Sequence, residues 1–373
     1  MPSFSWWSAA IWGGGLVGLG LVLLIAQMVY FMALCRWADR RTRGCNYYGQ
    51  PLAARRRFKR TLALLALGTR PLLWLLSRTT QVQLDQASFR FQGIAAPKDS
   101  CSPESFAEAV AYRPTDRDIF VATQMKSGTT WMQHLVYQIL TRGQGDLAER
   151  GDALYAISPW IEGIRSVAMA DSPNVGVPKS RRIIKTHLPT SLCPYAPEAR
   201  YIYVARHPVS CFVSAVDFLG SNLGPFRLPL SAYEQWFCSD QMWWGAWPQH
   251  VSGWLAWSRE RLNVLFVRFE EMRQDLPAVA QRVAKFIGVD DLTEEELGLV
   301  THHCSFAYMQ QHAESFEMNP PTVLQVAARQ FVRGTSERHA DVPPEVGERI
   351  LHWCRESAGT WNNDLIEHYR EIG

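Results

Sequence analysis

The sequence lacks the cysteine pairs, the strong net charge and the metal-ligand spacing that mark several common protein classes. Its eight cysteines form no C-x-x-C pair, which in a chain of 373 residues indicates reduced thiols and a cytoplasmic body. The net charge of +3 is too small to indicate nucleic acid binding. His302, His303 and Cys304 are adjacent, so their side chains point apart, and we expect no metal site.

Charged side chains are also absent from the first 35 residues. Within this stretch the run from Ala9 to Leu34 is nearly all apolar, and it exceeds the roughly 20 residues that cross a bilayer as a helix. A cleaved signal peptide would need a basic start, a shorter apolar core and a small-residue cleavage site, and the sequence has none of these. We therefore interpret residues 1–35 as an uncleaved transmembrane anchor, with the membrane as a partner.

The segment after the anchor is strongly basic, with nine Arg and Lys side chains between residues 36 and 60 and Asp39 as the single acid. Basic flanks favour the cytoplasmic side, so we expect a single-pass membrane protein whose body faces the cytoplasm. A second apolar stretch, Leu62–Leu76, is short for a span and is interrupted by Arg70-Pro71. We interpret it as a helix lying in the membrane interface. The alternative is a second span, which would place the body outside.

The remaining chain divides into a linker region and one domain. Residues 36–100 are predicted to form the basic juxtamembrane segment, with the interfacial helix and a linker, and residues 101–373 the domain. The polar, turn-rich segment 97–114 is interpreted as the entry linker. Beyond it, apolar runs alternate with helical patterns, which predicts an α/β domain with a parallel sheet. Strands are predicted at 118–123, 182–187, 199–206 and 263–269, and helices at 129–140, 210–219, 276–289 and 345–358.

The stretch TQMKSGTTW (123–131) lies between the first strand and its helix, where phosphate-binding loops occur. The usual nucleotide loop places two glycines before its lysine, whereas here Lys126 precedes Gly128. A tight turn at a helix start gathers free backbone N–H groups and the positive end of the helix dipole around one point. We therefore expect an anion site, with Lys126 acting on the anion as a point charge.

Two more predicted strands end in groups suited to the same anion. The strand 182–187 ends in Lys185 and His187, and the strand 199–206 ends in Arg206, with Ser214 in the helix that follows. Ligands of open α/β sheets bind at the carboxyl ends of the strands, so these groups should share one rim. His187 is a candidate base, because the ordinary histidine pKa is close to neutral pH. Arg206 with a hydroxyl is a suitable grip for a second phosphate.

Together these motifs resemble the cytosolic-type sulfotransferases. KSGTTW (126–131), KTHLP (185–189), ARHPVSCFVS (205–214) and NVLFVRFEEM (263–272) occur in the order and spacing of that family. GAWPQHVSGW (245–254) and HHCSFAYM (302–309) are also similar to it, so the resemblance spans about residues 110 to 340. It implies one P-loop-like parallel sheet flanked by helices, which binds 3′-phosphoadenosine 5′-phosphosulfate (PAPS). The sulfuryl group would pass to an acceptor hydroxyl or amine, without a metal.

The resemblance also implies a role for each motif residue. His187 would take the acceptor's proton, while Lys126 and Lys185 would stabilise charge on the leaving phosphate. Arg206 and Ser214 would hold the 3′-phosphate, with Arg333 and Gly334 closing over it. The loop around the 5′-phosphate and the adenine would be formed by Lys126, Ser127, Gly128, Thr129, Thr130 and Trp131.

The chain departs from the family pattern at three places. Gln124-Met125 stands where Tyr-Pro is usual, Phe269 replaces a tyrosine, and the late glycine-rich loop is reduced to residues 331–335. The membrane anchor suggests a small-molecule or lipid-like acceptor. Two other functions remain open: a P-loop-like kinase, which would need a metal-binding carboxylate, and a non-catalytic nucleotide-binding membrane scaffold, suggested by the reduced loop. The sequence does not indicate an oligomeric state.

Overall fold

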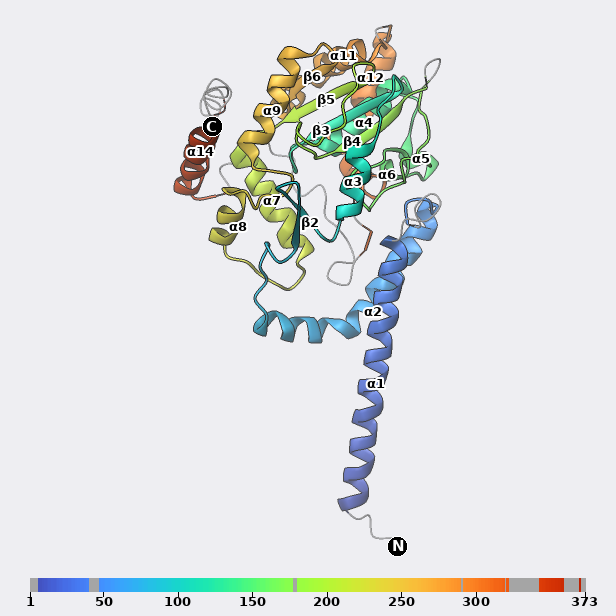
Figure 1. Cartoon of the computed structure of the whole chain (residues 1–373). Helices are drawn as coiled ribbons and strands as arrows, with labels where there is room; N and C mark the ends of the chain where they lie inside the picture. Colours follow the sequence, from blue (N-terminus) through green and yellow to red (C-terminus); the bar gives the residue numbers. More distant parts are fainter. Residues whose placement is uncertain are drawn as a thin grey trace.

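A long N-terminal helix projects from an α/β body (Figure 1). The structure, a computed structural model, describes residues 6–39, 47–176, 180–289, 291–318, 320–321, 342–358 and 369, with the backbone alone at 6–16, 39 and 358. The body is built on a parallel sheet with the strand order β4-β3-β5-β6. These are the four predicted strands, so the parallel α/β sheet is confirmed: β3 (Asp118–Thr123), β4 (Arg182–Thr186), β5 (Arg200–Ala205) and β6 (Val264–Arg268).

Helices cover both faces of this sheet, which is why its central strands read as continuous apolar runs. Ile119 and Val121 of β3 pack in the core on one face, while Phe120 and Ala122 pack in the core on the other. On the first face lie α4 (Thr129–Leu140), α11 (Leu276–Ile287) and α12 (Glu294–His303). On the second lie α7 (Pro208–Asn222), α9 (Trp247–Glu260) and α14 (Pro344–Ala358).

The four predicted helices are confirmed as α4, α7, α11 and α14. Helix α7 begins earlier than its apolar pattern, because Pro208 suits the first helical position and the His207 ring accepts a hydrogen bond from the Val209 N–H. Shorter helices complete the connections: α5 (Leu147–Arg150), α6 (Leu154–Ile157), α8 (Leu230–Phe237), α10 (Phe269–Gln274), α13 (Phe306–Gln311) and a 3₁₀ turn (Ala313–Ser315).

The linker predicted at residues 97–114 was wrong, because this segment contains α3 (Pro103–Ala111). Its turn-forming residues cap the helix: the Ser102 hydroxyl accepts a hydrogen bond from the Ser105 N–H at 3.1 Å, and Phe106 is fully buried. Before it, β1 (Ser88–Phe91) and β2 (Ile94–Pro97) form an antiparallel hairpin that packs on the same core. The folded body therefore extends to the N-terminal side of residue 101.

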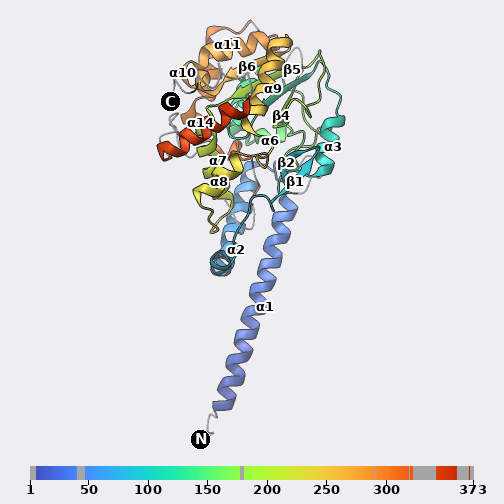
Figure 2. The ribbon, with the colours of Figure 1, turned by 60° about the vertical axis from the view of Figure 1, so that its left-hand side comes forward.

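Two helices precede the body. Helix α1 (Trp6–Asp39) is, among the described residues, the one helix long and apolar enough to cross a membrane. Helix α2 (Leu52–Thr79) continues through Pro71, so the predicted interruption at Arg70-Pro71 was wrong. Proline removes one hydrogen bond of the helical ladder, and here the bonds on either side keep the helix intact. In Figure 2, α1 extends away from the body, and α2 lies beside it below the body.

The start of α2 is joined to the body by buried polar contacts. The Arg55 guanidinium is buried and donates to the carbonyl oxygens of Glu314 at 2.9 Å and Gly151 at 3.1 Å. The Tyr47 hydroxyl donates to the Glu317 carboxylate at 3.0 Å, and Lys59 forms an ion pair with the same carboxylate. The part of the basic segment between residues 47 and 59 is therefore held mainly on residues 314–318.

Candidate active site

The loop between β3 and α4 has the conformation of an anion cradle. Lys126 and Gly128 both lie in the left-handed region, with φ of 65° and 99°. A Cβ at Gly128 would lie 2.7 Å from the Phe269 ring, so only glycine fits at this position. The loop ends at the N-terminus of α4, whose first N–H groups have no partner within the helix.

The side chains of this loop point in different directions. The Thr129 hydroxyl lies 2.6 Å from that of Thr123, and the Thr130 hydroxyl lies 3.1 Å from that of Tyr155. Ser127 is fully buried, with its hydroxyl 3.9 Å from the Cys211 sulfur, and it lies outside the lining of the cavity that the other loop residues border. The Trp131 indole donates to the Cys304 carbonyl at 2.7 Å, which fixes the ring at the cavity wall.

Gln124, where the family usually has tyrosine, connects this loop by hydrogen bonds to the loop that contains Trp243 and Gly245. Its fully buried amide donates to the carbonyl oxygens of Trp243, at 3.1 Å, and Gly245, and its own oxygen accepts from the Met125 N–H. Both Met125 and Trp243 line the cavity. The departure from the family pattern at residue 124 therefore has a structural role, because it fixes two cavity walls to each other.

His187 directly follows β4, and a contact of its ring defines which ring nitrogen carries the proton. Its Nδ1 is 2.9 Å from the Thr123 carbonyl oxygen. A carbonyl only accepts, so Nδ1 carries the proton and Nε2 is left as the acceptor. Burial, followed by the nearby Lys185 charge, holds the pKa of His187 well below its ordinary value of 6.5. The neutral form of the ring, which can take a proton, is therefore the stable one.

Lys185 is fully buried two residues before this histidine. Its Nζ lies 3.7 Å from the centre of the Trp160 indole ring and 3.2 Å from the Met318 sulfur. Burial lowers the pKa of the ammonium, and the Glu162 charge opposes that shift. A lysine in such a place is stabilised in its charged form whenever an anion enters the cavity.

Glu162, which the sequence analysis missed, organises both residues. Its fully buried carboxylate accepts hydrogen bonds from the His187 backbone N–H and the Trp160 indole, each at 2.7 Å, and from the Thr186 hydroxyl at 3.0 Å. It comes from an irregular segment before β4, joined to the strand through the bridge between Trp160 and Lys185. No spacing in the sequence marks such a carboxylate, since its partners meet it only through the fold.

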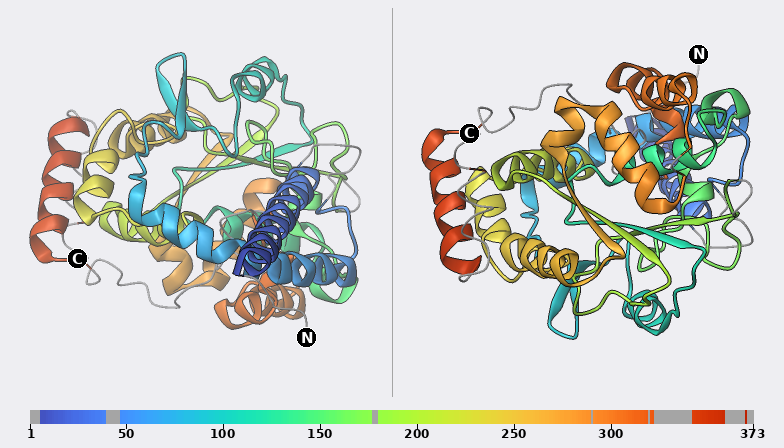
Figure 3. Two further views of the ribbon diagram at one scale, coloured as in Figure 1. Left: turned by 90° about the horizontal axis from the view of Figure 1, so that it is seen from below. Right: turned by 90° about the horizontal axis from the view of Figure 1, so that it is seen from above.

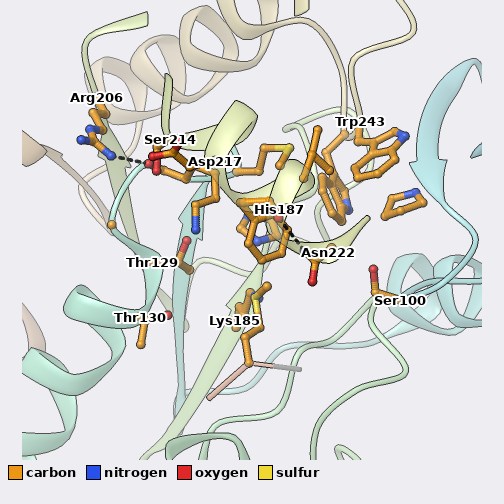
Figure 4. Close-up of a pocket in the computed structure, with 18 of the residues that line it drawn as sticks. Ser100, Thr129, Thr130, Lys185, His187, Arg206, Ser214, Asp217, Asn222 and Trp243 are labelled. Atoms are coloured by element: carbon orange, nitrogen blue, oxygen red, sulfur yellow. Dashed lines mark hydrogen bonds between the residues drawn. The ribbon is translucent and has the colours of Figure 1, made fainter. Parts of the chain in front are cut away.

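Arg206 and Ser214 form the other end of the site. The Arg206 guanidinium, at the end of β5, donates to the Lys126 carbonyl at 2.9 Å and lies 4.4 Å from the centre of the Phe269 ring. Ser214 projects from α7, and Figure 4 shows it beside Arg206, with His187 between this pair and Trp243. Arg333 and Gly334, which were predicted to complete this end, lie outside the described residues.

One cavity of about 410 Å³ is lined by Lys126, Gly128, Thr129, Thr130, Trp131, Lys185, His187, Arg206 and Ser214. The cavity has a cationic end and an apolar end, with Asp99 and Asp217 as its acidic lining residues. The cations are Lys126, Lys185, Arg206 and Arg273, and the apolar end is formed mainly by Val82, Leu84, Met125, Leu219, Leu223, Trp243 and Trp244. His250, in the motif 245–254, is buried outside the lining of this cavity, and its Nε2 donates to the His187 carbonyl at 2.9 Å.

The chain is similar in sequence to known sulfotransferases. Residues 116–362 match the family model described as the sulfotransferase domain. The chain is 33% identical to mouse sulfotransferase 2B1 over 253 residues, covering 66% of this chain and 72% of that protein. It is 31% identical to guinea pig 3-alpha-hydroxysteroid sulfotransferase, covering 60% of this chain and 77% of that protein.

Solved structures share the fold. A mouse sulfotransferase complexed with PAP superposes with a TM-score of 0.59 at 20% identity, covering 77% of this chain and 98% of that one. Retinol dehydratase in complex with retinol and PAP gives 0.60 at 19% identity, covering 74% and 94%. The chain therefore belongs to the sulfotransferase family and is a PAPS-dependent enzyme that transfers a sulfuryl group to an acceptor hydroxyl.

Proposed function

We propose that His187 is the general base of this transfer. The observation that supports the proposal is the Nδ1 contact with the Thr123 carbonyl, which leaves Nε2 as the proton acceptor at the cavity. His187 lies between the cationic end and the apolar end of the cavity (Figure 4). An acceptor whose apolar part fills one end would bring its hydroxyl or amine to this ring, within reach of a sulfuryl group held at the other.

Lys126 and Lys185 would stabilise the charge that develops on the leaving phosphate. Both side chains line the cationic end, and Lys185 is held in place by the Trp160 ring. In a desolvated cavity, fixed charges act on a transition state more strongly than in water. PAPS supplies the sulfuryl group when it is bound, and the loop Lys126, Ser127, Gly128, Thr129, Thr130 and Trp131 would hold its 5′-phosphate.

The second phosphate of the donor fits the pair Arg206 and Ser214. A guanidinium and a hydroxyl on one rim suit a phosphate group, and the Phe269 ring supports the guanidinium. Phe269 is in edge contact with Trp131, so these two rings are suited to border the adenine. We propose that Arg333 and Gly334 close over the same phosphate, and that no metal takes part.

The acceptor we propose is hydrophobic or amphiphilic. The apolar end of the cavity is bordered by two tryptophans and several aliphatic side chains, with the Ser100 hydroxyl beside them (Figure 4). The guinea pig relative is named for a 3-alpha-hydroxysteroid, and one similar structure holds retinol. Sterol-like and other lipid-like alcohols fit these observations.

We further propose that the enzyme is a single-pass membrane protein. Residues 1–35 would be the anchor, 36–100 the membrane-adjacent segment, and 101–373 the sulfotransferase domain, to which the β1–β2 hairpin adds. Many α1 side chains between Val17 and Tyr30 are exposed and apolar, and the basic flank favours a cytoplasmic body.

The test is a radiolabelled PAPS assay on the full-length chain with phenols, sterols and glycolipids. We expect wild-type turnover of an apolar alcohol, a loss of at least about 10²-fold for Lys126→Ala and His187→Ala, and retained PAP binding in His187→Ala. His352→Ala, at an exposed position on α14, is the control. PAP binding without transfer to any acceptor would contradict the proposal and favour the scaffold, whereas tight ATP binding would favour the kinase.

A further inference from the structure

The two N-terminal helices cross at a defined point. The Gln27 side-chain amide donates to the Leu65 carbonyl at 2.7 Å. Gly68 makes this approach possible, because a Cβ there would lie 2.6 Å from the Gln27 amide oxygen. Phe31 and Leu62 are buried in a small cluster shared by both helices, so α2 runs antiparallel to α1 up to the crossing. Beyond it, α2 runs across the underside of the body (Figure 3, left).

The length of α1 beyond this crossing matches a bilayer. Residues 6–26 of α1 lie on the far side of Gln27 from the body. At 1.5 Å per residue they extend about 30 Å, which is the thickness of the hydrocarbon core. If residues 6–26 are the part of the proposed anchor that crosses the hydrocarbon core, Gln27 and Leu65 lie at its surface, and the rest of α2 lies along that surface.

The exposed side of α2 has the composition that this position requires. Leu64, Leu67, Trp74 and Leu75 are between 54% and 69% exposed, and their spacing places them on one helix face. Arg60 precedes this apolar face, and Arg78 follows it with its guanidinium 4.7 Å from the centre of the Trp74 ring. Apolar side chains bordered by arginines are typical of helices that lie among lipid headgroups.

The chain leads directly from this helix to the acceptor end of the cavity. Helix α2 ends at Thr79, and Val82, Leu84 and Ala87 line the cavity together with Trp243 and Trp244. A segment of a few residues therefore joins the exposed apolar face of α2 to the apolar wall of the active site.

We propose that α2 lies in the headgroup region of a phospholipid bilayer and that lipid-soluble acceptors enter the cavity from the bilayer, past residues 80–87. This inference rests on the proposed function, in which the chain is membrane-anchored and the acceptor is apolar. The observations that favour lipid over a protein partner are the matching length of α1 and the short connection between the exposed apolar face of α2 and the apolar wall of the cavity.

The first experiment locates α2 in full-length protein reconstituted into phospholipid vesicles. Brominated phospholipids quench tryptophans that lie in the bilayer, and the difference between wild type and Trp74→Phe isolates the Trp74 signal. We expect more than half of that signal to be quenched by bromines near the headgroup. No quenching by any brominated lipid would overturn the proposal, including the case in which a second copy or another protein covers α2.

The second experiment compares two acceptors, a sterol embedded in the vesicles and a water-soluble phenol. The double variant Leu67→Glu, Leu75→Glu should lower kcat/KM at least tenfold for the sterol and less than twofold for the phenol. Leu262→Glu, at a fully exposed leucine of the body, is the matched control and should change neither. Equal effects on both acceptors, or none, would overturn the proposal. If wild type sulfates neither acceptor, the proposed function fails, and the quenching result still decides where α2 lies.

Discussion

The ammonium of Lys185 lies 3.7 Å from the centre of the Trp160 indole ring, and the N–H of that ring donates to the Glu162 carboxylate at 2.7 Å. The ring therefore has a cation at its face and an anion at its edge, which is the favourable arrangement for its quadrupole. Since the same carboxylate holds the His187 backbone, one buried acid positions the two groups that we propose for catalysis.

Replacing this acid by its amide should reduce catalysis more than binding. In Glu162→Gln the three donors lose a charged acceptor, and one of them faces an NH₂ group instead. Displacement of His187 by about 1 Å would cost about 10²-fold in kcat, while PAP affinity should change little. Stopped-time assays measure kcat, and PAP titration measures the affinity. Glu234→Gln, which breaks an exposed ion pair with Arg349, is the control. Unchanged kcat in Glu162→Gln would show that the carboxylate is only structural.

The kcat/KM of the enzyme should decrease at alkaline pH, and His187 should cause no decrease at acid pH. Lys185 acts in its protonated form, and burial lowers its pKa from 10.5 to about 7. The kcat/KM of the free enzyme should therefore fall as the pH rises through that value. The His187 ring is neutral in the neutral pH range, because burial holds its pKa well below 6.5. Lys185→Arg, whose guanidinium stays charged, should remove the decrease at alkaline pH. A profile that rises from pH 6 to 8 would contradict this assignment.

Three glycine-to-alanine variants should show why position 128 in the loop between β3 and α4 requires glycine. Gly288, after α11, and Gly298, inside α12, serve for comparison. Gly128 combines a φ of 99° with contact against Phe269, Gly288 has a φ of 78° in open space, and Gly298 has neither constraint. We expect Gly128→Ala to destabilise by up to about 3 kcal/mol and Gly288→Ala by about 1–2 kcal/mol. Gly298→Ala, inside α12, should stabilise by up to about 1 kcal/mol. Thermal unfolding in detergent gives the order, and equal shifts for Gly128 and Gly288 would exclude a contribution from Phe269.

Arg55 should hold the membrane-adjacent segment on the catalytic body. Arg55→Met keeps the apolar stem but leaves the carbonyls of Glu314 and Gly151 without this donor, at a cost of about 1–3 kcal/mol. Hydrogen exchange of residues 47–60 should become at least about tenfold faster. PAP affinity should also decrease. Met318, which contacts Lys185, lies shortly after Glu314, whose carbonyl Arg55 holds. Arg57→Met, at an exposed position, is the matched control. Equal exchange in both variants would contradict the role of Arg55.

The α/β sheet and most of the proposed site could be predicted from the amino-acid sequence. Apolar runs and helical periods predicted β3, β4, β5 and β6, because these strands are buried on both faces. Parallel strands place their carboxyl ends at one edge, so Lys126, His187 and Arg206 could be placed together from their positions alone. The glycine after the lysine likewise predicted a tight turn, which the φ of Gly128 confirms.

How these groups are held depends on contacts that form only in the folded chain. Glu162, Gln124 and Arg55 act through contacts with residues distant in sequence, and no local pattern marks a buried polar side chain whose partners come from elsewhere. The turn-forming residues of 97–114 predicted a linker, whereas in the fold they cap a helix that packs on the core. Local propensity sets which elements form, while the satisfaction of buried polar groups depends on which elements meet, and that is a property of the packed chain.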